Sequence, residues 1–546
     1  MRAILDDKNL LSAEEALKIY INSTLPRPLG EEEVDILNAL NRVSAEDILS
    51  PIDLPPFSRS TVDGYAVRDS ETPGEFKLIG KISIGEYKEV RIKEKEAVEV
   101  DTGAIIPDNA SAVVKVEETE KNGDIIVVKK KMRFGENIGW LGSDIPRGFE
   151  ILRKGEIITP EKIALLAAVG IRKVKVFKKP KIFIITTGDE LIEPGLPLAK
   201  GKIYESNSFY LYAKLMSEGY DVIGYTHVKD DKSAIKSELE KALQKADIVI
   251  LTGGTSAGEK DYVHQVIREL GKIIVHGLKF KPGKPTILAT VNNKPVIGLP
   301  GNIVSTIMIT ERVIIKYLSI LAGKEFADQY QVKATLMNDV KADKNRYTYV
   351  PVYLFIKNDK YYALSVPFDS YMIGTFASAD GYIGLEPGKE LKEGEEVLVY
   401  IKRIDLRPVY IGEEEPTILK ELKEFRKIPL GSFPALKALK YGIGDIVVIS
   451  KLYESSVAGD FTFTRKILQN GEGDKIGYHE WIGLSKLIDS PSIRLRYISL
   501  SVNFLGRATV IAPATVINEG KEITKEELVI IVSKNEYKSK LKTFFE

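Results

Sequence analysis

Hydrophobic residues change their spacing along the chain, and the changes mark different kinds of structure. Between residues 181 and 322, short continuous apolar runs alternate with longer stretches in which apolar residues recur every three or four positions. Continuous apolar runs are typical of buried strands, and the longer period is typical of amphipathic helices. Strands and helices that alternate at these lengths predict a doubly wound parallel α/β sheet with helices on both faces.

Two other regions show short alternating runs. Residues 76–132 and 330–404 contain hydrophobic and polar residues in alternation, interrupted by Gly, Pro and Asn. This pattern predicts β-strands joined by turns. We expect a β-rich domain in the N-terminal part of the chain and, after the central region, a small barrel or sandwich, of which we take the barrel as the prediction.

Helix signals occur outside the central region as well. Ser12 and Glu15 have the spacing of a capping box at the start of a helix predicted over residues 12–22. Residues 31–41 and 159–169 predict two further helices.

Together these patterns predict a multidomain protein of the α/β plus β class. Its predicted parts are a helical linking domain (1–50 with 145–178), a β-rich domain (51–144), a central α/β domain (179–325), a small β-barrel domain (330–405) and a C-terminal α/β extension (407–546). The segment RPVYIGEEEPT, residues 407–417, predicts a linker before the extension.

Composition excludes several classes of site. The chain has 546 residues, of which 44% are hydrophobic, so it can build several cores. It has no cysteine, which excludes disulfides, cysteine–zinc sites, iron–sulfur clusters and thiol catalysis. Only four scattered histidines are present, so any metal is expected to be a hard ion held by carboxylates, such as magnesium. A net charge of +1 argues against a nucleic-acid partner.

The sequence shows no targeting signal. The charged residues 1–11 lack the apolar core of a signal peptide. No run of about 18 apolar residues predicts a membrane span. We therefore expect a cytoplasmic protein without a membrane partner.

Three loops that follow predicted strands of the central domain carry the most informative polar residues. The first contains Thr187, Gly188, Asp189 and Glu190. A pair of carboxylates at the carboxyl end of a strand could hold a hydrated divalent cation. An ordinary turn in which the aspartate caps a helix is the alternative, and the loop alone does not decide between them.

The second loop is rich in glycine. Gly253, Gly254, Ser256 and Gly258 precede Asp261 and a predicted helix. Glycines allow the backbone to approach a ligand, and free N–H groups before a helix form an anion cradle. The spacing differs from that of a P-loop. A plain turn, with Asp261 capping the helix, is the alternative.

The third loop supplies positive charge. Lys281 and Lys284 stand among prolines, and Pro300 and Gly301 follow a later predicted strand. Lysines on a stiff loop can present fixed positive charge to phosphates, although solvated surface lysines are the more common case. The three loops together favour a phosphate-bearing ligand with a bridging cation.

Two polar segments lie in the predicted β-rich domain. Residues 55–66 include Ser60, Thr61 and Asp63, and residues 101–107 include Thr102. Side chains of these types also bond their own backbone in turns, so each segment has an ordinary structural alternative.

Seven strings of the sequence resemble a known family. They are, in order, PPFSRSTVDGYAV, DTGAIIP, GSDI, TTGDEL, TGGTSAGEKDY, KPGKP and GLPGN. The same strings occur in the same order in the molybdopterin molybdenumtransferase family, called MoeA in bacteria and archaea and the E domain of gephyrin in animals. The resemblance covers about residues 1–405, and the central domain is similar to MogA and MoaB proteins.

This resemblance implies a reaction. The enzyme would take adenylylated molybdopterin, insert molybdate or tungstate into the dithiolene, and release AMP with the help of Mg²⁺. It implies a homodimer in which the α/β domain of one subunit faces the β-rich domain of the other. The molybdopterin adenylyltransferase is a possible further partner.

The resemblance also assigns roles to residues. Asp63, Thr102, Asp144, Glu190 and Asp261 would be catalytic, and Glu190 and Asp261 would also hold the metal. The residues implied in substrate binding are Ser60, Thr61, Thr187, Gly188, Gly253, Gly254, Ser256, Gly258, Lys281, Lys284, Pro300 and Gly301.

The chain departs from the family pattern at two places. Ile303 stands where the family often has proline, and no arginine is present in the run from Asn137 to Asp144, where one is common. Two other functions stay open: the adenylyltransferase of the preceding step, which would not need residues 1–180 and 330–404, and a non-enzymatic scaffold or oxyanion sensor.

The tail has a resemblance of its own. Residues 429–452 resemble part of the periplasmic-binding-protein-like domain that is fused to some archaeal family members. Gly431 and Ser432 at a predicted helix start could bind an oxyanion, although a capped helix without a ligand is slightly favoured. Arg494, Arg496 and Arg507 add positive charge without forming a site that can be predicted.

Overall fold

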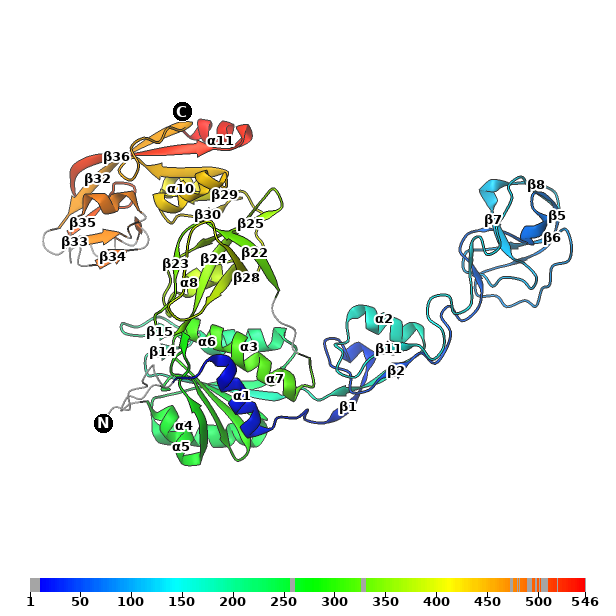
Figure 1. Cartoon of the computed structure of the whole chain (residues 1–546), viewed down its shortest axis with the longest axis horizontal. Coiled ribbons are helices and arrows are strands. Elements are labelled where there is room, and N and C mark those ends of the chain that lie inside the picture. Colours follow the sequence, from blue (N-terminus) through cyan, green and yellow to red (C-terminus); the bar gives the residue numbers. More distant parts are fainter. Residues whose placement is uncertain are drawn as a thin grey trace.

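The computed structural model describes residues 10–545, apart from 256–260, 326–329, 472–474, 479, 481, 489–492, 496–497, 500, 502–508 and 518. Figure 1 shows four parts in the chain. The central α/β unit, a barrel and the C-terminal extension are stacked on one another, and the N-terminal segments form an arm that reaches away from this stack (Figure 1). No helix among the described residues is long and apolar enough to cross a membrane.

The central unit contains a six-stranded sheet, which confirms the predicted doubly wound α/β architecture. Its strands lie in the order β16 (Asp221–Val228), β13 (Lys181–Thr187), β17 (Ile248–Thr252), β21 (Lys294–Leu299), β20 (Ile287–Val291) and β18 (Gly271–His276). The first four are parallel, but β20 runs antiparallel to both neighbours. The pattern did not predict this reversal, which Asn292 and Asn293 make possible because both adopt positive φ in the two-residue turn between β20 and β21.

Helices cover both faces of this sheet. One hydrophobic cluster joins it to α1 (Ala13–Thr24), α3 (Asn207–Ser217), α6 (Ile303–Ile309) and α7 (Ile315–Leu321), and a second joins it to α4 (Lys232–Lys245) and α5 (Tyr262–Leu270). The predicted capping box of Ser12 and Glu15 is present at the start of α1. The predicted linking domain included α1, but this helix packs on the α/β unit, where Tyr20 Oη donates to the carbonyl oxygen of Ala289 at 2.8 Å.

The linking part contains a strand where a helix was predicted. Residues 31–41 form β1 (Glu31–Asp35) and a short 3-10 turn (Ile36–Asn38), so the predicted helix is wrong. The acidic β1 pairs antiparallel with the basic β12 (Lys173–Phe177), and Lys173 Nζ lies 3.1 Å from Glu33. The side chain of Asp35 also caps the turn by accepting from the N–H of Leu37. Pairing with β12 and the packing of Val34 and Ile36 in one cluster with Val174 thus outweigh helix propensity.

The rest of the arm follows the prediction more closely. The predicted helix at 159–169 is α2 (Pro160–Ala168), which packs beside β2 (Ile48–Leu49) and β11 (Glu150–Leu152). The β-rich domain contains a six-stranded sheet of β7 (Ala112–Lys115), β4 (Gly64–Val67), β6 (Glu96–Val100), β5 (Gly74–Ile82), β9 (Ile125–Val128) and β8 (Thr119–Asn122), with a small pair formed by β3 (Arg59–Ser60) and β10 (Ile138–Gly139).

The predicted barrel is confirmed as a closed sheet of five strands. Its strands are β24 (Tyr347–Lys357), β25 (Lys360–Ser365), β22 (Gln331–Leu336), β28 (Glu396–Ile401) and β26 (Gly381–Leu385), and β26 pairs back with β24. The barrel is joined to the α/β unit through Arg312, which lies in a π-helical turn (Thr310–Ile314) between α6 and α7. The Arg312 guanidinium donates to Tyr349 Oη at 2.6 Å and stacks 4.1 Å from the Tyr400 ring.

The extension is an α/β structure built on one eight-stranded sheet. The strand order is β30 (Arg426–Ile428), β29 (Val409–Gly412), β31 (Ile446–Ser450), β36 (Lys521–Val532), β32 (Phe461–Asn470), β35 (Thr509–Pro513), β33 (Lys475–Tyr478) and β34 (Ile493–Leu495). Its helices are α9 (Pro416–Glu421), α10 (Ser432–Tyr441) and α11 (Asn535–Phe545). The predicted linker at 407–417 is wrong, because it contains the buried strand β29 and the start of α9.

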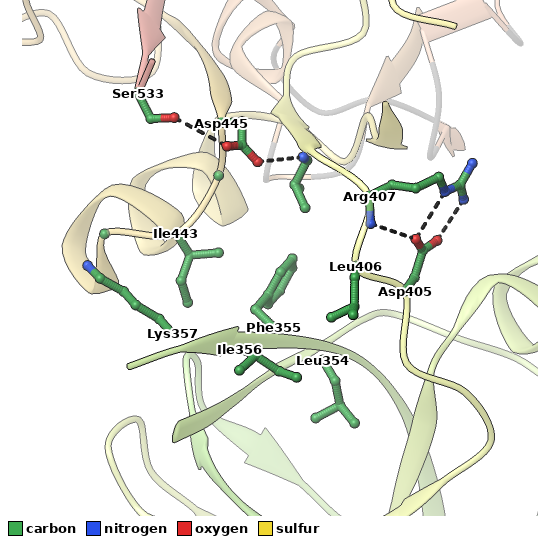
Figure 2. A pocket seen from close by; sticks show the side chains of 13 residues that line it. Leu354, Phe355, Ile356, Lys357, Asp405, Leu406, Arg407, Ile443, Asp445 and Ser533 are labelled. Atoms are coloured by element: carbon green, nitrogen blue, oxygen red, sulfur yellow. Dashed lines mark hydrogen bonds and ion pairs between the residues drawn. The ribbon is translucent and has the colours of Figure 1, made fainter. Parts of the chain in front are cut away.

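The extension and the barrel share a hydrophobic core. Tyr353 and Phe355 of the barrel pack in one cluster with Val409, Ile428 and further residues of the extension. A cavity of about 260 Å³ lies at this junction. Polar side chains that line it bond to neighbours, as Figure 2 shows: Asp405 to Arg407, and Asp445 to Ser533 and the backbone of Val409. The two parts are therefore packed together rather than joined by a flexible segment.

Candidate functional site

A pocket of about 440 Å³ lies at the carboxyl ends of β13, β17 and β21, where parallel α/β sheets usually bind ligands. Eight of the residues predicted for the site line it: Thr187, Gly188, Glu190, Gly253, Gly254, Asp261, Pro300 and Gly301. The strands end at one edge of the sheet, and so they bring together loops that are more than 100 residues apart in sequence. Ser256 and Gly258 lie outside the described residues.

Gly253 allows the second loop to fold against the first, and Gly188 lies close to the side chain of Glu190 within the first loop. Gly253 has φ of +90°, and a Cβ there would lie 2.5 Å from the carbonyl oxygen of Thr187. Gly188 has φ of +153°, and a Cβ there would lie 2.9 Å from both carboxylate oxygens of Glu190. A side chain at position 253 would push the two loops apart, so glycine is required there for the shape of the pocket, whereas a side chain at position 188 would displace only the flexible end of Glu190.

An acidic rim surrounds one side of the pocket. Glu190, Asp230 and Asp261 line it, and Asp189 is adjacent because its backbone N–H and that of Asp230 each donate to the other's carboxylate at 3.3 Å. Burial, together with the negative charges of Asp189 and Glu190, raises the pKa of Asp230 above its ordinary value. Repulsion among the carboxylates means that a bound cation would be stabilised here.

Asp230 was not among the predicted site residues. It follows β16, which was recognised as a strand, and its position at the strand's carboxyl end was the signal that could have identified it. The neighbouring Asp231 is an ordinary helix cap, because its Oδ1 accepts from the N–H of Ala234 at 2.8 Å. Two adjacent aspartates thus have different roles, one at the pocket and one at the start of α4.

Asn207 is a second residue that the sequence did not reveal. It begins α3, is only 6% exposed and lines the pocket. Its Nδ2 donates to the carbonyl oxygen of Gly301 at 2.8 Å, whereas its Oδ1 has no hydrogen-bond partner among the described residues. A buried acceptor of this kind is suited to an N–H or O–H group of a ligand.

Asp261 takes the helix-start position expected of a cap. However, its side chain makes no capping hydrogen bond to α5 in the structure. The alternative interpretation of this residue as a cap is therefore not supported, and Asp261 lines the pocket.

The two predicted lysines do not line the pocket. Lys281 Nζ lies 3.2 Å from Asp343 of the barrel region, and this ion pair holds the KPGKP loop beside the barrel. Burial of Asp343 opposes its ionisation, but hydrogen bonds from Arg346, Asn345 and Lys281 outweigh burial and lower its pKa. Pro285, directly after Lys284, is the residue of this loop that reaches the pocket lining.

The predicted residues of the arm gather on the β-rich domain. Asp63 Oδ1 accepts from the N–H of Thr102 at 2.6 Å and from its hydroxyl at 2.9 Å. Ser60 is buried and bonds the backbone, with its hydroxyl donating to the carbonyl of Val62. Thr61 is exposed and lies beside Asn137, to whose carbonyl its N–H donates at 3.0 Å.

Asp144 belongs to the same face. Its backbone N–H donates to the carbonyl of Leu54 at 3.0 Å, and its side chain is exposed. Three strings that are distant in sequence thus meet: β3 pairs with β10, and single bridges join Arg59 to Ile105 and Leu54 to Ile145. This exposed face is called the Asp63 face below.

One chain does not bring its two groups of site residues together. The Asp63 face belongs to the domain at the far end of the arm, whereas the pocket lies on the α/β unit at the other end (Figure 1). A site that uses both groups needs a second copy of the chain.

Comparisons with known proteins agree on the family. Residues 11–170 match the MoeA N-terminal region (domain I and II), residues 183–319 match a probable molybdopterin binding domain, and residues 333–402 match the MoeA C-terminal region (domain IV). The extension lies beyond these matches.

Individual relatives cover the same part of the chain. A putative molybdopterin biosynthesis protein of Methanocaldococcus jannaschii is 35% identical over 72% of this chain and 98% of its own length. A molybdopterin molybdenumtransferase of Haemophilus influenzae is 32% identical over 69% of this chain and 95% of its own. A solved molybdopterin biosynthesis MoeA protein of Pyrococcus horikoshii has 36% identity and a TM-score of 0.62, and covers 72% of this chain and 99% of its own. The chain therefore belongs to the MoeA family of molybdenum cofactor biosynthesis, the family of the molybdopterin molybdenumtransferases.

Proposed function

We propose that this chain inserts molybdate or tungstate into adenylylated molybdopterin and releases AMP, as a Mg²⁺-dependent homodimer. The observation that carries the proposal is the pocket of the α/β unit, in which glycine loops and an acidic rim meet within the region that matches a molybdopterin-binding domain. The substrate would come from the adenylyltransferase of the preceding step.

The pocket has the chemistry to hold the substrate. Backbone at Gly253 and Gly254 lies open to the pocket, and such loops can approach a pterin or phosphate closely. The buried Oδ1 of Asn207 offers an acceptor to N–H groups of the pterin. Together these groups would orient the substrate before any bond is broken.

The acidic rim fits a magnesium ion that is shared with the substrate. Among the described residues no group of three acidic or histidine side chains is arranged to hold a metal by itself. Mg²⁺ usually binds one or two protein carboxylates and completes its coordination shell with water and substrate phosphates. Glu190 and Asp261 are therefore enough to hold it, and Asp230 lies in the same pocket. The ion would supply charge neutralisation between the pyrophosphate link and the incoming oxyanion.

The Asp63 face would complete the site from a second copy. Asp63 is held in place by two hydrogen bonds from Thr102, so its second carboxylate oxygen is positioned to accept a proton or to orient water near the metal-insertion site. Thr61 and Asp144 are exposed on the same face and can contact the substrate or the oxyanion.

AMP release tests the proposal. The protein is incubated with adenylylated molybdopterin and Mg²⁺, with and without molybdate. We expect AMP to appear in proportion to molybdate insertion, and Asp63→Asn to abolish most of it. Asp108→Asn, an exposed change in the same domain, is the matched control and should retain wild-type activity. AMP formation that does not depend on molybdate, or an Asp63→Asn variant with wild-type activity, would contradict the proposal.

A further inference from the structure

Charged and polar side chains meet at the buried centre of the extension, away from the pocket of the α/β unit. Glu413 directly follows β29, Ser432 begins α10, Arg465 lies on β32 and Glu526 lies on β36. All four are at most 2% exposed. The carboxyl ends of parallel strands and the start of a helix are places where α/β folds bind anions.

One oxygen of Glu413 already occupies this position. Its Oε1 accepts from the N–H of Ser432 at 3.0 Å, from the hydroxyl of Ser432 at 2.6 Å and from the N–H of Gly483 at 2.7 Å. Ser432 belongs to the half of the extension that contains β29 and β31, and Gly483 belongs to the half that contains β33 and β35. Donors from both halves therefore converge on one carboxylate oxygen.

The second oxygen of Glu413 is not satisfied. Neither Glu413 Oε2 nor Arg465 Nη2 has a hydrogen-bond partner among the described residues, and the two atoms are 4.0 Å apart. The other two nitrogens of the Arg465 guanidinium already donate hydrogen bonds: Nε to Glu526 at 2.7 Å and Nη1 to Glu415 at 3.2 Å. One oxygen of the Glu413 carboxylate thus accepts hydrogen bonds from Ser432 and Gly483, whereas the other oxygen is too far from Arg465 Nη2 to accept one.

Charge limits what else could bind. Three buried carboxylates, those of Glu413, Glu415 and Glu526, face the single positive charge of Arg465. A monoanion that replaces Glu413 leaves this balance unchanged, whereas a dianion adds an unpaired negative charge in a buried site.

We propose that the centre of the extension is a binding site for a small monocarboxylate, and that Glu413 fills it in this structure as an internal stand-in. A free carboxylate can place one oxygen on the Ser432 and Gly483 donors and the other on Arg465 Nη2. It thereby pairs an N–H that the tethered side chain leaves without a partner. Entry requires the two halves to separate, because a Cβ at Gly483 would lie only 2.3 Å from Ser450.

Titration calorimetry on the full chain, with formate and acetate as probes, tests the site. Glu413→Ser vacates it and keeps a small polar side chain. We expect this variant to bind one formate per chain at least tenfold more tightly than the wild type at pH 8. Adding Ser432→Ala should weaken that binding at least fivefold, whereas Ser456→Ala, an exposed serine of the same half, should not change it.

Dianions test the ligand class. Sulfate and molybdate should bind the Glu413→Ser variant at least tenfold more weakly than formate. Equal or tighter binding of either would overturn the assignment to a carboxylate. A folded variant, with the circular dichroism of the wild type, that binds neither formate nor acetate would overturn the site itself.

The wild type gives an independent test that does not depend on how the variant folds. Burial and the charge of Glu526 raise the pKa of Glu413 to about 7, so a proton weakens its hold on the donors below that pH. The groups that face it are Arg465, Glu526, Glu415, Glu414, Tyr410 and Tyr453. We expect wild-type affinity for formate to be at least fivefold higher at pH 6 than at pH 8, and an unchanged affinity would contradict the proposal.

Discussion

Individual side chains explain why the candidate site forms and why the sequence did not predict all of its residues. Thr187, Glu190 and Gly253 were predictable, because each stands in a loop directly after an apolar strand. Asp230 and Asn207 were not predictable, because only the folded structure shows that β16 and α3 bring both side chains to this pocket. Lys281 was predicted to face phosphate, yet the sequence could not show that Asp343, 62 residues away, would bind it.

The first prediction concerns Asp230. Asp230→Asn removes one negative charge from the acidic rim, so the affinity for Mg²⁺ at the neighbouring carboxylates should fall. We expect molybdate-dependent AMP release to drop by roughly 10- to 100-fold at limiting Mg²⁺, with partial recovery at high Mg²⁺. Glu238→Gln on α4, which pairs at the surface with Lys241, is the control and should be neutral. An equal loss of AMP release in both variants would contradict a role of Asp230 in binding Mg²⁺.

At the scale of elements, the spacing of hydrophobic residues predicted most helices and strands. It failed for segments whose secondary structure depends on contacts with residues distant in sequence. The strands of the sheet and barrel and the helices α1 and α2 follow from local pattern. The segment at 31–41 does not, since its strand pairs with β12, which lies more than 130 residues further along the chain. The segment at 407–417 resembles a linker, but Val409 and Ile411 are buried by residues of the barrel and of α10.

A second prediction tests the joint between the α/β unit and the barrel. Arg312→Lys loses the hydrogen bond to Tyr349 and the planar stacking on Tyr400, and leaves a less well-paired buried charge. We expect a loss of about 2–4 kcal/mol in the free energy of unfolding, measured with urea. Lys333→Ala on the exposed side of β22 should change it by less than about 0.5 kcal/mol. Similar values for the two variants would show that the joint does not depend on Arg312.

A third prediction concerns pH and the extension. The pKa of Glu413 is about 7 in the folded protein, compared with an ordinary value of 4.5. Between these values the folded protein holds a proton that the unfolded chain releases, so stability must fall as pH rises through this range. We expect the unfolding temperature of the extension to be higher at pH 6 than at pH 8. Glu413→Gln should reduce this difference, and a wild type that is more stable at pH 8 would contradict the assignment.

At the scale of the whole molecule, the shared core of barrel and extension has no counterpart in the part of the chain that the Methanocaldococcus jannaschii relative matches. The relative from Methanocaldococcus jannaschii matches 72% of the chain over nearly its whole length, so it has no counterpart of the extension within that match. In this protein Tyr353 and Phe355 of the barrel are covered by the extension. Sequence could predict that an extension exists, but not that it shares a core with the barrel, from which we expect the barrel to depend on it.

The fourth prediction follows from that dependence. A chain ending at residue 405 exposes the apolar side of the barrel, so it should aggregate or unfold at a lower temperature than the full chain. Light scattering during a thermal ramp measures both effects. The change Phe355→Lys should make the truncated chain more soluble while destabilising the full chain. A truncated chain as stable and soluble as the full one would show that the shared core contributes little.

The arrangement of the arm leads to the central claim, that the pocket of one copy is completed by the Asp63 face of another. On the proposed function, we expect Asp63→Asn and Glu190→Gln each to inactivate a different half of the same composite site. Mixing equal amounts of the two inactive variants, with exchange of subunits, should restore about one quarter of wild-type AMP release, because half of the dimers then contain one intact site. No recovery in verified mixed dimers would contradict a site shared between two copies.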